Sequence, residues 1–504
     1  MSGIMMQLLG AAGKSLGWYF VYDPHPYDTD EAATFNDIVI ASDDTIICAG
    51  GQDNWKAFLI SFNTDGAVQN KTQISNSSYY IRQESGPSLS INSSDKVALS
   101  FAFDVSSNNR RWACTVLNKD LTTAMSTSNR MTYAGDRNAT SDGDLVFVRN
   151  ALGDDNRMYW ATSYTDNNKA RYRIAQNKTN STEGFTAYQS AGSSAPAMVN
   201  TANDELAVCY APDQDNTGIS TIGVIDADYG SLASSDQNLI WKANMAFGNS
   251  QPNSVRINDI AYDCSTYLYA VAHNGVYGTS SDTGKSVGII KVAASNGALQ
   301  WQKKYQLNSL TALNGNAGYL NGISCALDPN GNLFFIGEGG SAATVASSQF
   351  VVFGKILANG DFSWCHQLKW DSATSIQSGQ TFTRADNFNN GRVKSGIACD
   401  STGAVYIATS AKEIVSGTNK QERPFLIKVN NDGTTVGDFG DFVISEANSA
   451  TNVTSGLSYN TQSAGSGDRF LYHAPASSGY NTYSHITNSA TTNIGSTDYQ
   501  LNKM

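Results

Sequence analysis

The stretch that decides the fold runs from Ser395 to Ile444 and reads SGIACDSTGAVYIATSAKEIVSGTNKQERPFLIKVNNDGTTVGDFGDFVI. It contains four apolar runs separated by polar residues, at 395–399, 404–408, 424–429 and 441–444. Two of the separating segments, 400–403 and 431–433, place Gly after Asp or Thr, and Gly and Asp tolerate the positive φ of tight hairpin turns. The stretch therefore predicts four short antiparallel strands.

The same turn signal recurs along almost the whole chain. The strong turn signals are Asp-Gly or Asn-Gly pairs whose glycines are Gly66, Gly297, Gly360 and Gly433. Weaker turn signals lie at Asp120, Gly184, Gly230 and Gly495. Neighbouring turn signals are 46 to 73 residues apart. Repeats of this kind, with several short strands per unit, are typical of a β-propeller. We therefore expect an all-β chain in which residues 35–504 form one propeller of four-stranded antiparallel blades. Eight blades are favoured, and seven are the alternative.

Three of the units resemble a bacterial β-propeller repeat. That repeat runs as a strand, Asp-x-x-Gly-Asn, an aromatic strand, Lys with an aliphatic residue, Asp-Gly and then Trp. The units are residues 257–301, 322–364 and 395–444, and the first two end on Trp301 and Trp364. The resemblance covers residues 255–445 well and 36–250 loosely. It implies a fold and no particular function, because propellers host unrelated activities.

The composition excludes several classes of protein. The net charge is −11, and nucleic acid binding needs clustered Lys and Arg, so we expect no nucleic acid partner. Charged residues make up 15% of the chain and hydrophobic residues 40%, which suits short strands better than solvent-exposed helices or disorder. No apolar run reaches the roughly 18 residues of a membrane-spanning helix. The seven cysteines are widely spaced, so we interpret them as small buried hydrophobic residues in a reducing cytoplasm.

Motifs with recognisable chemistry are missing from the sequence. Neither the His and Cys spacings of zinc sites nor a Gly-x-Ser-x-Gly nucleophile elbow is present. Two acidic loops, Asp213–Gly218 and Asp226–Gly230, are interpreted as turns, because the first has Val224 where a calcium loop needs Glu. A pair of carboxylates brought together at the central channel is left open. The sequence otherwise predicts no metal, no cofactor and no enzymatic activity.

The N-terminal 34 residues are expected to lie outside the repeat. Ile4, Met5, Leu8 and Leu9 fall on one face if the segment is helical, and Trp18 opens an apolar-aromatic run. Together these five residues form a candidate assembly anchor, through which the chain would bind other proteins or its own symmetry mates. The alternative is that residues 1–34 plug one face of the propeller. The first positive charge, Lys14, follows the apolar stretch, which does not suit a secretory signal.

The opening residues MSGIMMQLLG also resemble the short apolar N-termini of structural and tail proteins of marine bacterial viruses. The resemblance implies a virion protein, assembled in the host cytoplasm and fastened to other virion proteins through its N-terminus. Our leading hypothesis is a tail-associated propeller that contacts the host surface, with a capsid-decorating or purely architectural virion role as an alternative. A bacterial carbohydrate-binding propeller is the other alternative, and a hydrolytic or quinoprotein-like enzyme is the third class that we weighed.

Binding to a surface glycan would use exposed aromatic side chains, which stack on sugar rings while neighbouring amides and hydroxyls form hydrogen bonds. The candidates are Trp55, Tyr79, Tyr80, Trp112 and Trp160, although each of them also suits packing. A homo-oligomer is possible, and the sequence does not indicate the number of subunits.

Overall fold

The computed structural model describes most of the repeat region. The described residues are 18–22, 33–52, 56–75, 80–81, 87–106, 109–122, 131–133, 147–154, 158–166, 169–178, 181–187, 197–201, 205–210, 220–226, 239–247, 255–274, 287–307, 319–340, 349–370, 380–384, 396–415, 418–433, 442–446, 450–453, 457–462, 470–472, 485–486 and 499–503. All regular structure within them is β-strand, which confirms the all-β expectation.

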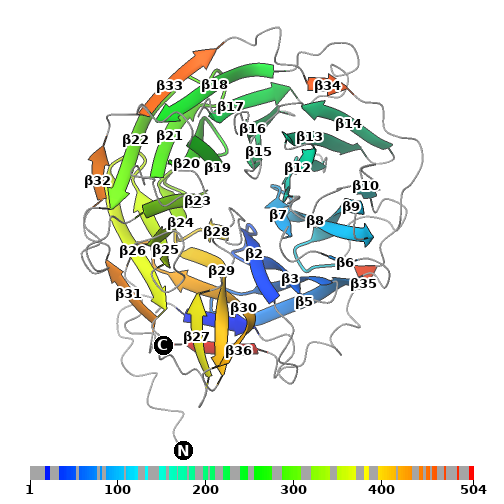
Figure 1. The fold of residues 1–504 in the computed structure, drawn as a ribbon, viewed down its shortest axis with the longest axis vertical. Coiled ribbons are helices and arrows are strands. Elements are labelled where there is room, and N and C mark those ends of the chain that lie inside the picture. Colours follow the sequence, from blue (N-terminus) through cyan, green and yellow to red (C-terminus); the bar gives the residue numbers. More distant parts are fainter. Residues whose placement is uncertain are drawn as a thin grey trace, which may run out of the picture.

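The described strands form seven antiparallel sheets arranged around a central axis (Figure 1). We number these sheets as blades 1 to 7 in chain order. The innermost strand of each blade contacts the innermost strand of the next, and β28 of blade 7 contacts β2 of blade 1, so the ring is closed. The structure is a β-propeller, as predicted.

Blades 1, 3, 4, 5 and 6 are meanders whose first strand lies nearest the axis. In blades 2 and 7 the innermost strands are β7 and β28, which pair with β8 and β29, and β6 and β27 pair with the same two strands. The strands are, in blade 1, β2 (Ala33–Ile40), β3 (Ile46–Gln52), β4 (Lys56–Phe62) and β5 (Val68–Ser75); in blade 2, β6 (Tyr80–Ile81), β7 (Ser88–Ile91), β8 (Lys96–Ser106), β9 (Asn109–Asn118) and β10 (Met131–Tyr133); in blade 3, β11 (Phe147–Leu152), β12 (Met158–Asp166), β13 (Lys169–Lys178) and β14 (Ser181–Ala187); and in blade 4, β15 (Ala197–Thr201), β16 (Glu205–Tyr210), β17 (Ser220–Asp226) and β18 (Leu239–Phe247).

The remaining blades follow the same order. Blade 5 contains β19 (Val255–Tyr262), β20 (Tyr267–Asn274), β21 (Val287–Ala293) and β22 (Leu299–Leu307); blade 6 contains β23 (Tyr319–Leu327), β24 (Leu333–Gly340), β25 (Gln349–Ile356) and β26 (Phe362–Trp370); and blade 7 contains β27 (Gln380–Arg384), β28 (Gly396–Cys399), β29 (Val405–Val415), β30 (Thr418–Val429) and β1 (Trp18–Tyr22).

The last blade is completed by the N-terminus. Strand β1 pairs antiparallel with β30, with Trp18 opposite Lys428 and Val21 opposite Phe425. The sequence had suggested Asp441–Ile444 as the fourth strand of this unit and residues 1–34 as a separate extension. Both expectations are wrong for the described residues, because 18–22 supply that strand. Trp18 is 2% exposed inside the ring, so it is not available as an assembly anchor.

The described strands between residues 442 and 503 lie around the outside of the ring, and we call them the strap. Its strands are β31 (Phe442–Glu446), β32 (Ala450–Val453), β33 (Leu457–Gln462), β34 (Phe470–Tyr472), β35 (His485–Ile486) and β36 (Tyr499–Lys503). They pair with the outer strands of blades 6, 5, 4, 3, 1 and 7 in turn, and each pairing is antiparallel. Figure 1 shows these orange and red strands at the periphery. The strap therefore follows the blades in reverse order.

The strap explains why the favoured count of eight blades is wrong and the alternative of seven agrees with the described strands. The sequence places several strand-like runs after residue 450, which suggested one more blade. In the structure each of these runs pairs with a different sheet. A strand-like sequence pattern shows that a segment forms a strand, and the tertiary structure decides which strand it pairs with.

The hydrophobic core lies between the blades. Successive side chains of a strand point to opposite faces, so each sheet contributes one face to each neighbour. Ile47, Ala49 and Leu59 of blade 1 pack against Leu99 and Leu117 of blade 2. Equivalent clusters join blades 4 and 5, blades 5 and 6, and blades 7 and 1.

A hydrogen bond from a tryptophan indole to a main-chain carbonyl of the next blade recurs at several joints, and we call it the tryptophan clasp. Trp241 Nε1 donates to Ala294 O at 2.7 Å, Trp301 Nε1 to Ala358 O at 3.0 Å, and Trp364 Nε1 to Asn431 O at 3.2 Å. Ala294 and Ala358 belong to the turn between the last two strands of the next blade, and Asn431 belongs to the turn that follows β30 of blade 7. Trp18 completes the series, because its Nε1 donates to Thr64 O of blade 1 at 2.9 Å.

A lysine reinforces the clasp at three joints. Lys428 Nζ donates to Thr64 O at 3.0 Å, and Lys291 Nζ donates to Ala358 O at 3.3 Å, so each of these carbonyls accepts from an indole and an ammonium group. Lys355 Nζ donates to the Asn431 side chain, again at the turn that receives an indole. This explains why Lys, Asp-Gly and Trp occur together in the repeat.

Glycine is required at the turn that receives the indole. Gly433 has φ of 78°, and a Cβ atom placed there would lie 2.8 Å from the Trp364 ring. Gly297 has φ of 69°, with the Trp241 ring 2.5 Å from the same position. Any other residue would strain the backbone and also displace the indole.

We predict that Trp18→Ala lowers the free energy of unfolding by about 3–5 kcal/mol, because it removes a fully packed side chain at the ring closure. Chemical denaturation followed by tryptophan fluorescence and circular dichroism measures the change. Ile240→Ala is the matched control, because Ile240 is 46% exposed and its truncation should cost little. Equal unfolding midpoints for wild type and Trp18→Ala would show that closure does not depend on this side chain.

Candidate functional site

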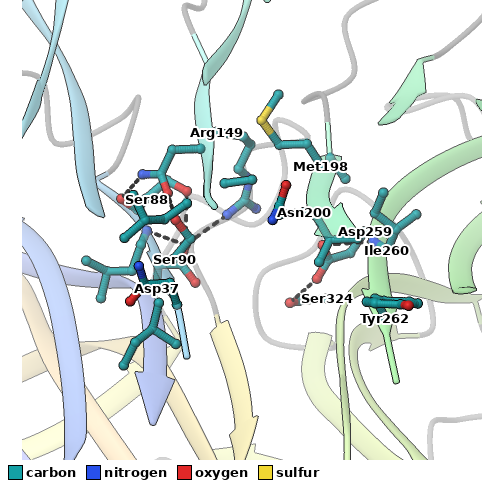
Figure 2. Close-up of a pocket in the computed structure, with 18 of the residues that line it drawn as sticks. Asp37, Ser88, Ser90, Arg149, Met198, Asn200, Asp259, Ile260, Tyr262 and Ser324 are labelled. Atoms are coloured by element: carbon teal, nitrogen blue, oxygen red, sulfur yellow. Dashed lines mark hydrogen bonds and ion pairs between the residues drawn. The ribbon is translucent and has the colours of Figure 1, made fainter. Parts of the chain in front are cut away.

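A cavity of about 670 Å³ lies on the propeller axis. The innermost strands of all seven blades contribute to its lining, from β2 and β7 round to β23 and β28. Charged, amide and hydroxyl side chains line it together with apolar ones. Figure 2 shows Arg149 and Asn200 in the space between Asp37 on one side and Asp259 with Ser324 on the other. We call this space the axial cavity.

Asp37 is fixed at a β-bulge in the innermost strand of blade 1. The pairing of β2 with β3 shifts register between Phe35 and Asp37, and this leaves the carboxylate free to turn toward the next blade. Its Oδ1 accepts from Ile38 N at 2.9 Å. Its Oδ2 accepts from Ser88 Oγ at 3.1 Å and from Leu89 N at 2.8 Å, both in blade 2.

Asp259 repeats this arrangement in blade 5. The register shifts between Ile257 and Asp259, and Asp259 Oδ1 accepts from Ile260 N at 3.0 Å. Its Oδ2 accepts from Ser324 Oγ at 2.5 Å and from Cys325 N at 2.9 Å, both in blade 6. Each carboxylate therefore joins its own blade to the following one at the axis.

Arg149 lies between the two carboxylates, and its positive charge acts on both of them. It comes from β11 of blade 3, and its Nη1 donates to Asp37 Oδ2 at 3.3 Å, with both side chains about 15% exposed. A guanidinium group has five N–H donors, and this bond uses one of them. Within the described part of the chain, Asp37 is the one hydrogen-bond partner of this group.

The two carboxyl groups are harder to ionise than exposed ones. Burial raises the pKa of Asp37, against the opposing effects of Arg149 and of the hydrogen bonds from Leu89 and Ile38. Burial likewise raises the pKa of Asp259, and the charge of Arg149 again opposes the shift. The single guanidinium does not compensate for the desolvation of both acids.

A polar network continues from blade 2 to blade 3. Asn150 Nδ2 donates to Ser88 O at 2.7 Å and to Ser100 Oγ at 2.8 Å, and Ser90 Oγ donates to Asn150 Oδ1 at 2.5 Å. These bonds hold β11 against β7 and so position the adjacent Arg149. Both polar atoms of the Asn150 side chain are bonded within this network.

Asn200 is different, because its Oδ1 is buried without a hydrogen-bond partner among the described residues. It lies in β15 of blade 4 and lines the axial cavity. An unsatisfied buried acceptor costs about 1–3 kcal/mol. A donor supplied by a ligand would remove that cost.

The rim of the axial cavity includes residues of the turns that follow the innermost strands. Asp154 accepts a hydrogen bond from Ser93 N at 2.9 Å, and hydrogen bonding from the side chain and the main chain of Ser93 lowers the pKa of Asp154. Tyr262 lines the cavity at the end of β19, and Cys264 lies in the next turn with φ of 58° and is exposed. Burial raises the pKa of the Cys264 thiol, and the Asp263 charge adds to the shift.

The residues predicted from the sequence are not gathered at this cavity. Ile4, Met5, Leu8, Leu9, Trp55 and Tyr79 lie outside the described residues. Tyr80, Trp112 and Trp160 belong to strands β6, β9 and β12, and their side chains are not described. The Asp213–Gly218 loop also lies outside, and the described residues contain no cluster of metal-ligating side chains.

The important residues were missed because they carry no motif of known chemistry. One signal was available: Asn-Asp-Ile occurs at residues 36–38 and again at 258–260, each time at the start of a unit. Arg149 and Asn200 have no such repeat, and only the closed ring brings them near the two aspartates.

Comparison with known proteins gives an architecture and little more. No family model matches the chain, and no curated protein matches it. Among solved structures, the polysaccharide lyase Uly1 is 10% identical, with 79% of this chain and 90% of that chain covered and a TM-score of 0.39. NanB sialidase from Streptococcus pneumoniae is 9% identical, with 80% and 68% covered and a TM-score of 0.37. An α-L-arabinanase from Penicillium chrysogenum is 9% identical, with 63% and 92% covered and a TM-score of 0.32.

These comparisons correct one expectation from the sequence. The chain was expected to be non-enzymatic because it lacks catalytic motifs, yet a lyase, a sialidase and an arabinanase are among the structures it resembles. The missing motifs therefore do not exclude an enzyme. At such low identity and TM-score, no activity, ligand or residue role passes from those proteins to this one.

The membrane expectation concerns helices only. Within the described ranges, the structure contains no helix with the length and hydropathy that crossing a membrane requires.

We predict opposite pH responses for two of the cavity acids. The raised pKa of Asp259 means that the folded state holds its proton more strongly than the unfolded state, so its contribution to stability falls as pH rises from about 3.8 through the raised value. The lowered pKa of Asp154 gives the reverse sign, with stability lost as pH falls through the folded value. Urea midpoints of wild type, Asp259→Asn and Asp154→Asn between pH 3 and pH 7 test both signs. The same sign in both variants would contradict the assignment.

Proposed function

We propose that the axial cavity binds a saccharide. The observation that carries the proposal is the buried Asn200 Oδ1, which lines the cavity and lacks a partner among the described residues. A ligand that supplies a donor would satisfy this acceptor in place of water. Sugar hydroxyl groups both donate and accept, so they can bond Asn200 and also accept from the N–H groups of Arg149.

The size and mixed polarity of the cavity support the same ligand class. Ligand sites commonly have volumes of about 300–1,000 Å³, and the axial cavity has about 670 Å³. Tyr262, Met198 and Ile260 add aromatic and apolar surface to the lining. A sugar ring has an apolar C–H face and a polar edge, so it can use both kinds of surface.

The proposal leaves open whether the saccharide is only bound or also cleaved. Asp37 and Asp259 accept hydrogen bonds from neighbouring blades, so their evident role is to hold the ring together at its axis. Their raised pKa values are also what general acid catalysis uses. Product analysis on any saccharide that binds decides between the two.

We predict that Asn200→Ala weakens saccharide binding about threefold to tenfold, the range expected for one lost hydrogen bond. A glycan array with the full chain identifies ligands, and isothermal titration calorimetry then measures the dissociation constants. Asn70→Ala is the matched control, because Asn70 is exposed on outer strand β5. The same ligand should also slow maleimide labelling of Cys264 at the rim. Binding that is unchanged in Asn200→Ala, together with unprotected Cys264, would place the ligand elsewhere.

We also propose, as a second candidate role, that residues 1–17 attach the propeller to other virion proteins. One observation favours it: the chain enters the ring at β1, which lies between β30 and the strap strand β36 at the outer side of blade 7. Strand β1 therefore lies at the periphery of the ring rather than at the axial cavity. Tail attachment, capsid decoration and contact with a host glycan are the specific forms of this proposal.

We predict that the full chain forms a defined oligomer and that a chain beginning at Ser15 is a monomer, as measured by light scattering. The shortened chain must keep Trp18–Tyr22, because these residues supply the last blade with β1. Circular dichroism and the unfolding midpoint should be the same for both chains. Two equally stable monomers would rule out residues 1–14 as a self-assembly anchor.

A further inference from the structure

The charges that face the axial cavity are unequal. The charged residues among those described in its lining are Asp37, Asp154, Asp259 and Arg149. Three carboxylates against one guanidinium leave two negative charges without a compensating side chain when all are ionised. Arg149 is paired with Asp37 and its charge also acts on Asp259, so two carboxylates share one guanidinium and the rim residue Asp154 adds a third negative charge.

The hydrogen-bond donors of Asp259 and Asp154 carry no charge. Asp259 accepts from Ile260 N, Ser324 Oγ and Cys325 N, all of which are neutral donors. Asp154 accepts from the main chain and the side chain of Ser93, which are also neutral donors. Neutral donors stabilise a carboxylate without cancelling its charge, so the field in the cavity is negative when these acids are ionised.

The titration behaviour of the inner acids agrees with this charge balance. Burial raises the pKa of both Asp37 and Asp259, although each feels the positive charge of Arg149. The charge of Asp37 also raises the pKa of Asp259, so the two carboxylates repel each other across the cavity. A second positive charge between them would relieve that repulsion.

We infer that the saccharide bound in the axial cavity carries ammonium groups, as an amino sugar does. The inference rests on the saccharide-binding function proposed above and names the class of sugar. An ammonium group has three N–H donors and one positive charge, so it can bond the unpartnered Asn200 Oδ1 and also offset the charge of Asp259. Figure 2 shows Asn200 between Arg149 and Asp259, where such a group would lie.

The alternatives fit the cavity less well. An acidic saccharide would pair with Arg149 but would add negative charge beside Asp259 and Asp154. A bare metal ion would need several close ligands, and the described residues contain no cluster of three metal-ligating side chains. A neutral saccharide meets the hydrogen-bonding needs of Asn200 and leaves the charge uncompensated. The amino sugar is the class that satisfies both requirements.

The experiment compares three trisaccharides by isothermal titration calorimetry on the full chain at pH 6. The probes are a β-1,4-linked glucosamine trimer, its N-acetylated and therefore neutral counterpart, and a galacturonic acid trimer. We expect the glucosamine trimer to bind at least tenfold more tightly than its acetylated counterpart, and the acidic trimer to bind most weakly. Raising the salt concentration from 0.05 to 0.5 M should reduce the difference, because salt screens charges.

Two variants distinguish the effect of the Asp154 charge in the cavity from a general effect of net charge. Asp154→Asn should weaken the glucosamine trimer about threefold to tenfold and leave the acetylated trimer unchanged. Asp65→Asn is the matched control, because it removes the same charge from an exposed hairpin turn outside the cavity. Asp65→Asn should leave the affinity for all three probes within twofold of wild type.

The outcomes distinguish this inference from the proposed function. If the acetylated or acidic trimer binds as tightly as the glucosamine trimer, the amino-sugar inference is overturned and saccharide binding stands. An equal loss of affinity in Asp154→Asn and Asp65→Asn would also overturn it, because the effect would then come from net charge. If no saccharide binds, on the array or in the calorimeter, the proposed function fails and the inference fails with it.

Discussion

The contact between a tryptophan of one blade and the hairpin turn of the next is the interaction on which the ring depends. The indole N–H donates to a main-chain carbonyl of that turn, and at Ala358 and Thr64 a lysine donates to the same oxygen. The turn must place Gly against the indole, because a Cβ atom at Gly433 or Gly297 would lie within 3 Å of the ring. Three residues far apart in the repeat are therefore required together, and each joint of this kind fixes the position of one blade against the next.

Closure extends the same interaction to the two ends of the chain. Trp18 lies only 17 residues from the start of the chain, yet it makes the bond that Trp241, Trp301 and Trp364 make in their blades. Its ring also packs against Phe62 of blade 1 and Tyr406 of blade 7. The strap then covers β1 from outside through β36. A strand edge left open at this point would expose unpaired main-chain groups, and the strap pairs that edge.

The axial cavity results from the way in which the inner strands are joined. Asp37 and Asp259 occupy equivalent bulges, and each bonds the innermost strand of the following blade. Carboxylates used for this purpose bring negative charge to the axis, and Arg149 offsets only part of it. The groups that hold the blades together therefore also set the electrostatic field of the axial cavity.

The sequence by itself determined the class of fold, the order of strands within a unit and the importance of Lys, Asp-Gly and Trp in it. These features are local: strand periodicity and turn chemistry act over a few residues, so they can be recognised without a structure. The tertiary structure decided the rest. Whether residues 442–503 form another blade or a strap, and whether Trp18 is an anchor or a core residue, depends on pairing with strands hundreds of residues away. The axial cavity brings together Arg149, Asn200, Asp37 and Asp259 only because the ring closes. No short-range sequence pattern predicts that these residues lie near one another.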